Sequence, residues 1–170
     1  MADEQFQPSW FPDGWPIPTI GGLEILRSQF GFLSSDEEDR IRFTMFDVHE
    51  GKGHAIILAE LGVIEAGWLV ATTVQCTLYF RDGEEVPSCV PGDRTTWPAV
   101  AYGDWLASAI WDFGSSTMRT MVSGQAGSDL LTIQKITPKP ALLTRAEVEA
   151  DLTTDDADEE PKDEESARDE

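Results

Sequence analysis

The stretch AIILAELGVIEAGWLVATTVQCTLYF, residues Ala55–Phe80, is a long apolar run. It has the length of a membrane span, but Glu60 and Glu65 lie inside it, and two buried glutamates would cost several kcal/mol in a bilayer. We therefore interpret the run as the core of a folded domain. The segment Gly62–Gly67 predicts a turn that divides it, and the second half, rich in β-branched and aromatic residues, is typical of a long strand. The pattern leaves open whether Ala55–Leu61 is a strand or a helix.

The residues before this run alternate in polarity. In RIRFTMFDV, residues 40–48, arginine and threonine alternate with apolar residues, which is the period of a half-buried strand. The phase breaks at Phe46 and Val48, as it does at a β-bulge. The segment Glu50–Gly53 then predicts a hairpin turn in which glycine supplies a positive φ angle.

Both histidines of the chain flank this turn, in HEGKGH. The pattern differs from the zinc-binding HExxH, because on a helix His49 and His54 would diverge by about 140°. A hairpin would instead make them cross-strand neighbours, with Asp47 on the face of His49. Structural zinc usually needs four ligands, and the other soft donors, Cys76 and Cys89, are far away in the sequence, so we expect no metal site.

The cysteines and the first residues of the chain indicate the cellular compartment of the protein. Cys76 and Cys89 do not have CxxC spacing, and MADEQFQPSW contains neither a basic nor an apolar signal region. We therefore expect ordinary thiols in a cytoplasmic protein. Cys89 lies in a segment, residues 81–96, whose prolines and glycines predict a loop.

The main helix is predicted in WPAVAYGDWLASAIWDFG, residues 97–114. Asp104 is a plausible N-cap and Gly114 a plausible stop, which predicts a helix over Trp105–Phe113. Its apolar residues fall within an arc of about 140°, and Trp111 falls almost opposite that arc. Either the N-terminal arm covers Trp111, or this tryptophan is an interface anchor flanked by Asp104 and Asp112.

Residues 1–19 are expected to form an extended N-terminal arm. Four prolines alternate there with aromatic residues that include Trp10 and Trp15, and this excludes a regular helix. The arm either packs on the domain or docks on a partner. Next, Leu23–Phe30 predicts a short helix that ends near Gly31.

The C-terminal third contains the predicted domain boundary. Leu130–Ile136 predicts a last strand, and two prolines end a domain that we place at residues 20–140. A capping box predicts a short helix within residues 141–153, and the acidic tail, residues 154–170, is expected to be disordered. The expected fold is α+β: a small antiparallel sheet or partly open barrel with one main helix.

The charge disfavours ordinary nucleic-acid binding. Residues 1–145 carry 10 basic and 19 acidic residues, and residues 146–170 carry 2 basic and 13 acidic ones. Binding to a phosphate backbone relies on lysine and arginine, so an acidic domain disfavours it. A basic protein surface is the favoured partner.

We find no sequence context that indicates catalysis. No histidine is placed near a serine or cysteine in a known hydrolase motif, and the glycines near Gln125 do not match a nucleotide-binding pattern. We therefore expect a protein that is not an enzyme and holds no cofactor.

Two hypotheses follow. The favoured one is a non-enzymatic acidic interaction protein, of the inhibitor, immunity or assembly-chaperone type and in the extreme a DNA mimic, which binds a basic protein surface. Its candidate contacts are Trp111, Asp104, Asp112, Trp10 and Trp15. The alternative is a single-stranded-DNA accessory protein with a small β-barrel, for which the candidate contacts are Arg40, Arg42, Arg81 and Arg94.

Overall fold

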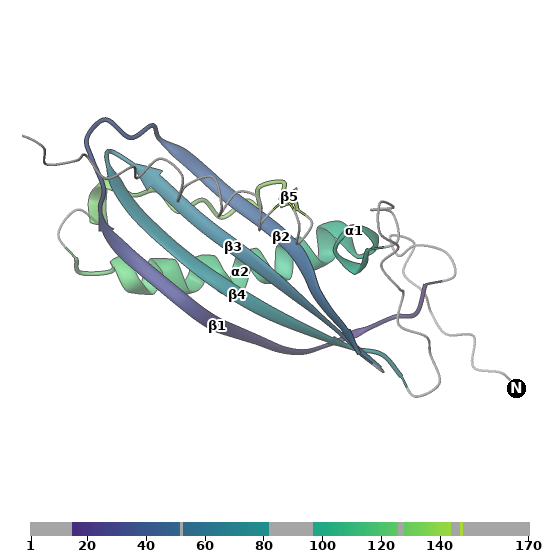
Figure 1. Cartoon of the computed structure of the whole chain (residues 1–170). Coiled ribbons are helices and arrows are strands. Elements are labelled where there is room, and N and C mark those ends of the chain that lie inside the picture. Colours follow the sequence, from purple (N-terminus) through teal and green to yellow (C-terminus); the bar gives the residue numbers. More distant parts are fainter. Residues whose placement is uncertain (1–14, 52, 82–96, 126–127, 144–146, 148–170) are drawn as a thin grey trace, which may run out of the picture.

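The computed structural model describes residues 15–51, 53–81, 97–125, 128–143 and 147, with only the backbone for residues 47–51 and 128. Its elements, in chain order, are β1 (Thr19–Phe32), β2 (Arg40–Gly51), β3 (His54–Glu65), β4 (Trp68–Tyr79), α1 (Pro98–Ala101), α2 (Gly103–Val122), a 3₁₀ turn (Ser128–Leu130) and β5 (Ala141–Leu142). The described strands form one sheet in the order β1-β4-β3-β2-β5, and α2 lies across one of its faces (Figure 1).

This architecture confirms the α+β class and the single main helix. The four long strands are antiparallel to their neighbours, as expected, but β5 pairs with β2 in parallel at Thr44 and Met45, so the sheet is mixed. The two outer strands of the described sheet do not pair with each other, so the sheet is open and is not a closed barrel.

Two tight turns connect the three central strands. The turn between β2 and β3 contains Gly53 with φ 77°, which confirms the predicted hairpin. Between β3 and β4, Ala66 (φ 50°) and Gly67 (φ 78°) both have positive φ angles, as a type I′ hairpin turn requires. The Ala66 amide donates a hydrogen bond to Asp39 Oδ1 at 2.7 Å. A side chain at Gly67 would collide with the carbonyl oxygen of Ser34, so glycine is needed there.

The core lies between the sheet and α2. Along β3 and β4 every second residue is fully buried, with Ile57, Leu61 and Val74 among them. The split of the apolar run at the expected turn is confirmed, and Ala55–Leu61, for which the sequence left strand or helix open, belongs to a strand. Leu61 and Val74 both lie against Gly114 of α2, so this set of residues faces the helix. We call the opposite side of the sheet the distal face.

The helix predicted over Leu23–Phe30 is wrong, because these residues belong to β1. Two register shifts interrupt its pairing with β4, one between Ile20 and Gly22 and one between Ile25 and Arg27. Each shift inserts an extra residue and changes which later residues face α2. The apolar residues therefore lose their period of two and acquire spacings that imitate a helix.

The main helix is longer than predicted. It starts at Gly103, after the N-cap residue Tyr102, so Asp104 lies in its first turn and is not the N-cap. It also continues through Gly114 to Val122, and the following polar residues, expected to be a loop or a frayed extension, belong to its last two turns. Gly114 is buried against the sheet, where its missing side chain lets the helix approach.

The predicted position of Trp111 on the polar side of the helix is wrong. Trp111 is 0% exposed, its ring centroid lies 5.5 Å from that of Phe43, and its Nε1 donates a hydrogen bond to the Gln134 carbonyl oxygen at 3.3 Å. The segment 131–140, predicted to contain a strand, is irregular and runs beside α2. Its residues, with Leu131 buried, cover the face for which the sequence suggested the N-terminal arm or a partner.

The ends of the described chain pack on the core. Trp15 makes an edge-to-face contact with Tyr102, whose hydroxyl donates a hydrogen bond to the Pro16 carbonyl oxygen at 2.7 Å. This part of the arm therefore packs on the domain. The rest of the arm with Trp10, the loop with Cys89 and Arg94, most of the capped helix and the acidic tail lie outside the described residues. None of the described helices has the length and apolar composition that a membrane crossing needs.

Candidate functional site

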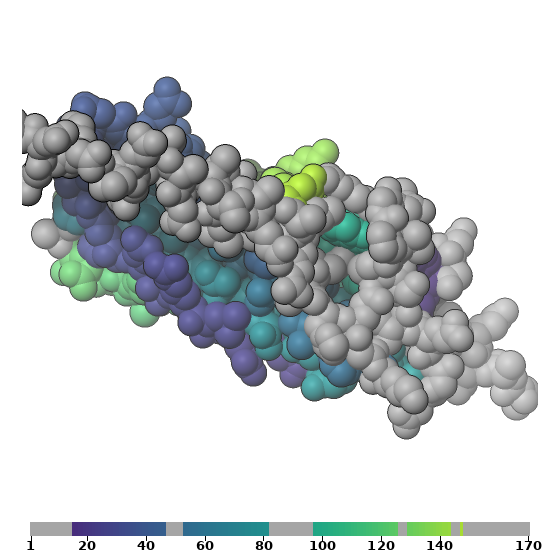
Figure 2. Space-filling model, viewed as in Figure 1, coloured from purple at the N-terminus to yellow at the C-terminus, as the bar shows by residue number. Residues whose placement is uncertain are grey.

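The distal face contains a hollow of about 340 Å³ between β1 and β2. Figure 2 shows the molecule with the purple atoms of β1 along the lower border of the sheet. The register places Arg42, Gly62, Ala71 and Gln29 side by side in one row across the four long strands. Strands lie about 4.8 Å apart, so this row is about 14 Å wide.

The floor of the hollow is shallow because its central residues are small. Gly62 and Ala71 are neighbours on β3 and β4, and a Cβ atom built on Gly62 would lie 3.7 Å from the Ala71 Cβ atom, an ordinary contact. Toward the end of the sheet, Ile64, Leu69 and Leu33 give the hollow an apolar wall. A ligand would therefore meet backbone and aliphatic surface at the centre.

Three arginines surround this floor. Arg40 and Arg42 come from β2, where the predicted alternation puts both on the distal face, and Arg27 comes from β1 on the other side. Glu60 is the acidic side chain in the lining, so the hollow carries a net charge of about +2 in a chain whose net charge is −20. This local excess of positive charge makes the hollow the best candidate for an anion-binding site.

A β-bulge turns Arg27 toward the hollow. Ile25 pairs with Val74, which faces α2, whereas Arg27 pairs with Thr73 on the distal face. The extra residue between them, Leu26, is 52% exposed. Without the bulge, Arg27 would point to the same side as Ile25. The buried Thr72 hydroxyl stabilises this geometry by donating a hydrogen bond to the Arg27 carbonyl oxygen at 3.1 Å.

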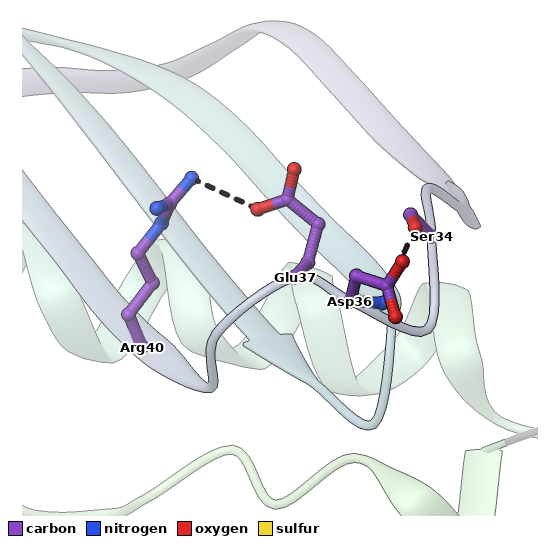
Figure 3. Close-up of polar contacts among 4 residues, drawn as sticks. All are labelled: Ser34, Asp36, Glu37 and Arg40. Carbon is purple, nitrogen blue, oxygen red and sulfur yellow. Dashed lines mark hydrogen bonds and ion pairs between the residues drawn. The ribbon is translucent and has the colours of Figure 1, made fainter.

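The arginines keep hydrogen-bonding capacity for a ligand. The Arg42 guanidinium forms an ion pair with the Glu60 carboxylate at 3.8 Å. The Arg40 guanidinium forms one at 3.5 Å with the carboxylate of Glu37, which lies in the β1–β2 loop (Figure 3). Both arginine side chains are about 60% exposed, and such pairs stabilise a protein by roughly 0–1 kcal/mol. Arg27 has no carboxylate within ion-pair distance among the described residues. A carboxylate or phosphate could therefore exchange with the existing partners at low cost.

The structure brings together only part of the predicted arginine set. Arg40 and Arg42 line one hollow, whereas Arg81 follows the far end of β4, about eight residues or 26 Å along the strand direction from Thr73. Arg27 was missed, because its alignment with the other two depends on the bulge. The signal was the broken alternation around Leu26, which we read as helical.

The residues predicted to bind a basic partner do not form one surface. Asp104 and Asp112 are exposed on α2, on the other side of the sheet from the hollow. Trp111 between them is buried, so it offers no surface to a partner. Trp15 is partly buried against Tyr102.

The histidines are not paired in the way that we predicted. His54 lies opposite Gly51, and His49 lies opposite Ile56, so the two are diagonal rather than direct neighbours. The register shift between Asp47 and His49 places Asp47 opposite Ile57 and His49 opposite Ile56, so an irregularity of the kind expected for this strand lies between the two residues. No group of three metal-ligating side chains occurs among the residues whose side chains are described.

Cys76 is buried in the core between the sheet and α2, and desolvation raises the pKa of its thiol from 9.0 to about 12. The thiolate is the reactive form, so we expect Cys76 to resist iodoacetamide at about pH 8 in the folded protein and to react after unfolding in urea. Because the folded pKa is the higher one, this thiol stabilises the fold fully below its ordinary pKa and loses that contribution as the pH rises toward 12. Mass spectrometry of the alkylated peptide measures the reaction, and rapid labelling of the folded chain would contradict the burial.

No protein-family model matches the chain, and no curated protein sequence is significantly similar to it.

Proposed function

We propose that this chain is a non-enzymatic interaction protein that binds an acidic segment of a protein partner in the hollow of its distal face. The observation that carries the proposal is the ring of Arg27, Arg40 and Arg42 around a floor of small and aliphatic residues. Guanidinium groups bind carboxylates through paired, charge-assisted hydrogen bonds, and the floor offers apolar contact area between them. At about 340 Å³, the hollow suits a few side chains.

The acidic remainder of the surface restricts the ligand to a short one. The β1–β2 loop next to the hollow contains Asp36, Glu37, Glu38 and Asp39. A long polyanion that left the hollow would meet these carboxylates, whereas a short acidic segment would not. The basic protein surface expected from the net charge is a separate proposal, which concerns this acidic remainder and not the hollow.

Single-stranded DNA is the second candidate, because Arg40 and Arg42 do lie on one face together with Arg27. Stacking of bases on aromatic rings supplies much of the affinity of proteins that bind single strands. Among the described residues, no aromatic side chain lines the hollow. The hollow therefore supports a carboxylate ligand better than a nucleic acid.

Binding to three labelled probes tests the proposal: an acidic decapeptide of aspartate and glutamate, a lysine decapeptide and a thymidine decamer. We would use the full chain with the ten acidic residues between positions 155 and 170 changed from Asp to Asn and from Glu to Gln, here the neutral-tail variant, so that these carboxylates do not compete with the probe. We expect fluorescence anisotropy to show the tightest binding for the acidic decapeptide.

Two substitutions in the neutral-tail variant locate the site. Arg42→Gln should weaken binding of the acidic decapeptide about tenfold, since one charge-assisted hydrogen bond contributes about 1.5 kcal/mol. Gly62→Val should weaken it similarly by filling the floor, and it should not reduce stability, because a β-branched residue suits a strand and meets only an ordinary contact there. Lys135→Gln, which removes an exposed charge outside the hollow, is the matched control.

Three other outcomes would contradict the proposal. Preferred binding of the lysine decapeptide, unaffected by Arg42→Gln, would support the acidic surface as the interface. Preferred binding of the thymidine decamer, lost with Arg42→Gln, would support the DNA-binding alternative. Binding of the acidic decapeptide that survives both Arg42→Gln and Gly62→Val would show that the hollow is not the site.

A further inference from the structure

We propose that a few consecutive residues of the acidic C-terminal segment, residues 154–170, dock in the hollow of the chain's own distal face and compete there with the partner. This inference rests on the proposed function of the hollow. The tail would then be an intramolecular ligand of the three arginines. An external acidic segment would have to compete with the tail for them.

Charge complementarity is the first observation. Residues 154–170 contain ten acidic and two basic residues, a net charge of −8. In the described part of the chain, the side chains that line the hollow carry three arginines against Glu60. The run of carboxylates therefore has the composition that the hollow favours, and the ligand is present in every molecule.

The path of the chain is the second observation. β5 pairs with β2 at Thr44 and Met45, and the Leu143 amide donates a hydrogen bond to the Met45 carbonyl oxygen at 3.1 Å. The chain therefore passes Leu143 at the edge of β2, on the strand that carries Arg42 two residues before Thr44. Because β5 runs parallel to β2, the chain leaves Leu143 in the direction of Gly51, and the linker has to turn back about four residues, or about 13 Å, along β2 to reach Arg42.

The linker is long enough to reach every part of the site. Asp155, the first acidic residue of the tail, is twelve positions after Leu143. From β5, the far side of the hollow on β1 is four strand spacings away, or about 19 Å. A flexible chain of twelve residues has a root-mean-square span of about 19 Å and an extended length of about 40 Å, so it can reach β1. Even if residues 145–152 form the short helix predicted from the capping box, that helix adds about 12 Å of reach.

Because the tail and the hollow belong to one chain, even a weak contact between them is enough for docking. A short flexible linker gives an effective concentration of the order of millimolar, so docking is populated even when the free segment would bind with a millimolar dissociation constant. The contact is made by exposed charges, so it should weaken strongly as salt screens it. An acidic partner that also contacts the apolar floor would displace the tail at a lower concentration than one that binds through charge alone.

Paramagnetic relaxation enhancement in the full chain tests the docking directly. A spin label on Ser166→Cys, in a Cys89→Ser background, would report on the tail, while Cys76 stays unlabelled because it is buried. We expect the label to broaden the backbone amide signals of Arg42, Gly62 and Ala71. The signals of Asp112 and Ser116, exposed on α2 beyond the sheet, should remain sharp.

Matched variants connect the broadening with charge. We expect it to disappear in the neutral-tail variant carrying the same label, in the double substitution Arg27→Gln and Arg42→Gln, and in about 0.5 M NaCl. The neutral-tail variant should also bind the acidic decapeptide at least about twofold more tightly than the chain with its native tail, because docking in half of the molecules already halves the apparent affinity. Lys135→Gln should leave the broadening unchanged.

The outcomes separate this inference from the proposed function. Absent or uniform broadening, together with equal affinities for the two tails, would overturn the docking and leave the hollow as a partner site. Selective broadening without binding of the acidic decapeptide to the neutral-tail variant would support the docking and overturn the proposed partner. In a mixture of spin-labelled chains and isotope-enriched chains without a label, any broadening arises between molecules. Broadening that occurs only in this way would overturn docking within one molecule.

Discussion

Trp111→Ala is expected to lower the free energy of unfolding by about 3–5 kcal/mol, the usual cost of removing a large aromatic side chain from a core. Trp111 is fully buried and packs against Phe43. Its removal would leave a cavity between α2 and the sheet and would free the Gln134 carbonyl oxygen from its hydrogen bond. Since small domains are stable by about 5–15 kcal/mol, the variant would lose a large fraction of its stability.

Urea denaturation measures this loss as a shift of the midpoint at an unchanged m value. Trp111→Phe is the first control, since it keeps much of the ring volume and removes the indole N–H, and it should lose clearly less. Asp112→Ala is the second control. Asp112 is the sequence neighbour of Trp111 but its side chain is exposed, so its replacement should change the free energy of unfolding by less than about 0.5 kcal/mol. A Trp111→Ala variant with normal stability but impaired partner binding would restore the interface role that the burial contradicts.

The misplacement of Trp111 shows what a short sequence window lacks. The window from Trp105 to Phe113 predicts a buried face made of Trp105, Leu106, Ala109, Ile110 and Phe113. In the full helix, the buried stripe also contains the small residues Ala107, Gly114 and Ser115. Small side chains permit close approach to a sheet, but in a sequence they resemble a solvent-exposed side. The partner of Trp111, at residue 134, is also far from it in sequence.

The strands β2, β3 and β4 were predictable because their signals are local. Alternating polarity and turn residues with positive φ are visible within a few positions, and the Ala66–Gly67 turn falls inside the expected segment. The strand β1 was not predictable, because its bulges depend on pairing with β4. The same limit applies to the site: the phase of Arg40 and Arg42 could be read from β2, but Arg27 joins them only through a bulge.

Gly114→Leu is expected to destabilise the protein by about 1–3 kcal/mol, at the upper end of that range, because it overpacks the contact between α2 and the sheet. Even a Cβ atom at this position would lie 2.7 Å from Leu61 Cδ2 and 3.1 Å from Val74 Cγ2. Leu61 is 1% exposed and Val74 is fully buried, so neither can turn out to solvent. This loss would occur although leucine is a better helix former than glycine by nearly 1 kcal/mol.

Two comparisons distinguish close packing from helix termination as the role of Gly114. Gly103→Ala, at the start of the same helix with open space around it, should be neutral or slightly stabilising. Leu61→Ala alone should cost about 2–5 kcal/mol, but combined with Gly114→Leu it should cost at least 1 kcal/mol less than the sum, because the new side chain fills the space that Leu61 leaves. If Gly114→Leu were as stable as the native chain, α2 would not approach the sheet as closely as the structure shows. If the effects of the two substitutions simply added, Leu61 would not be the side chain that Gly114 accommodates.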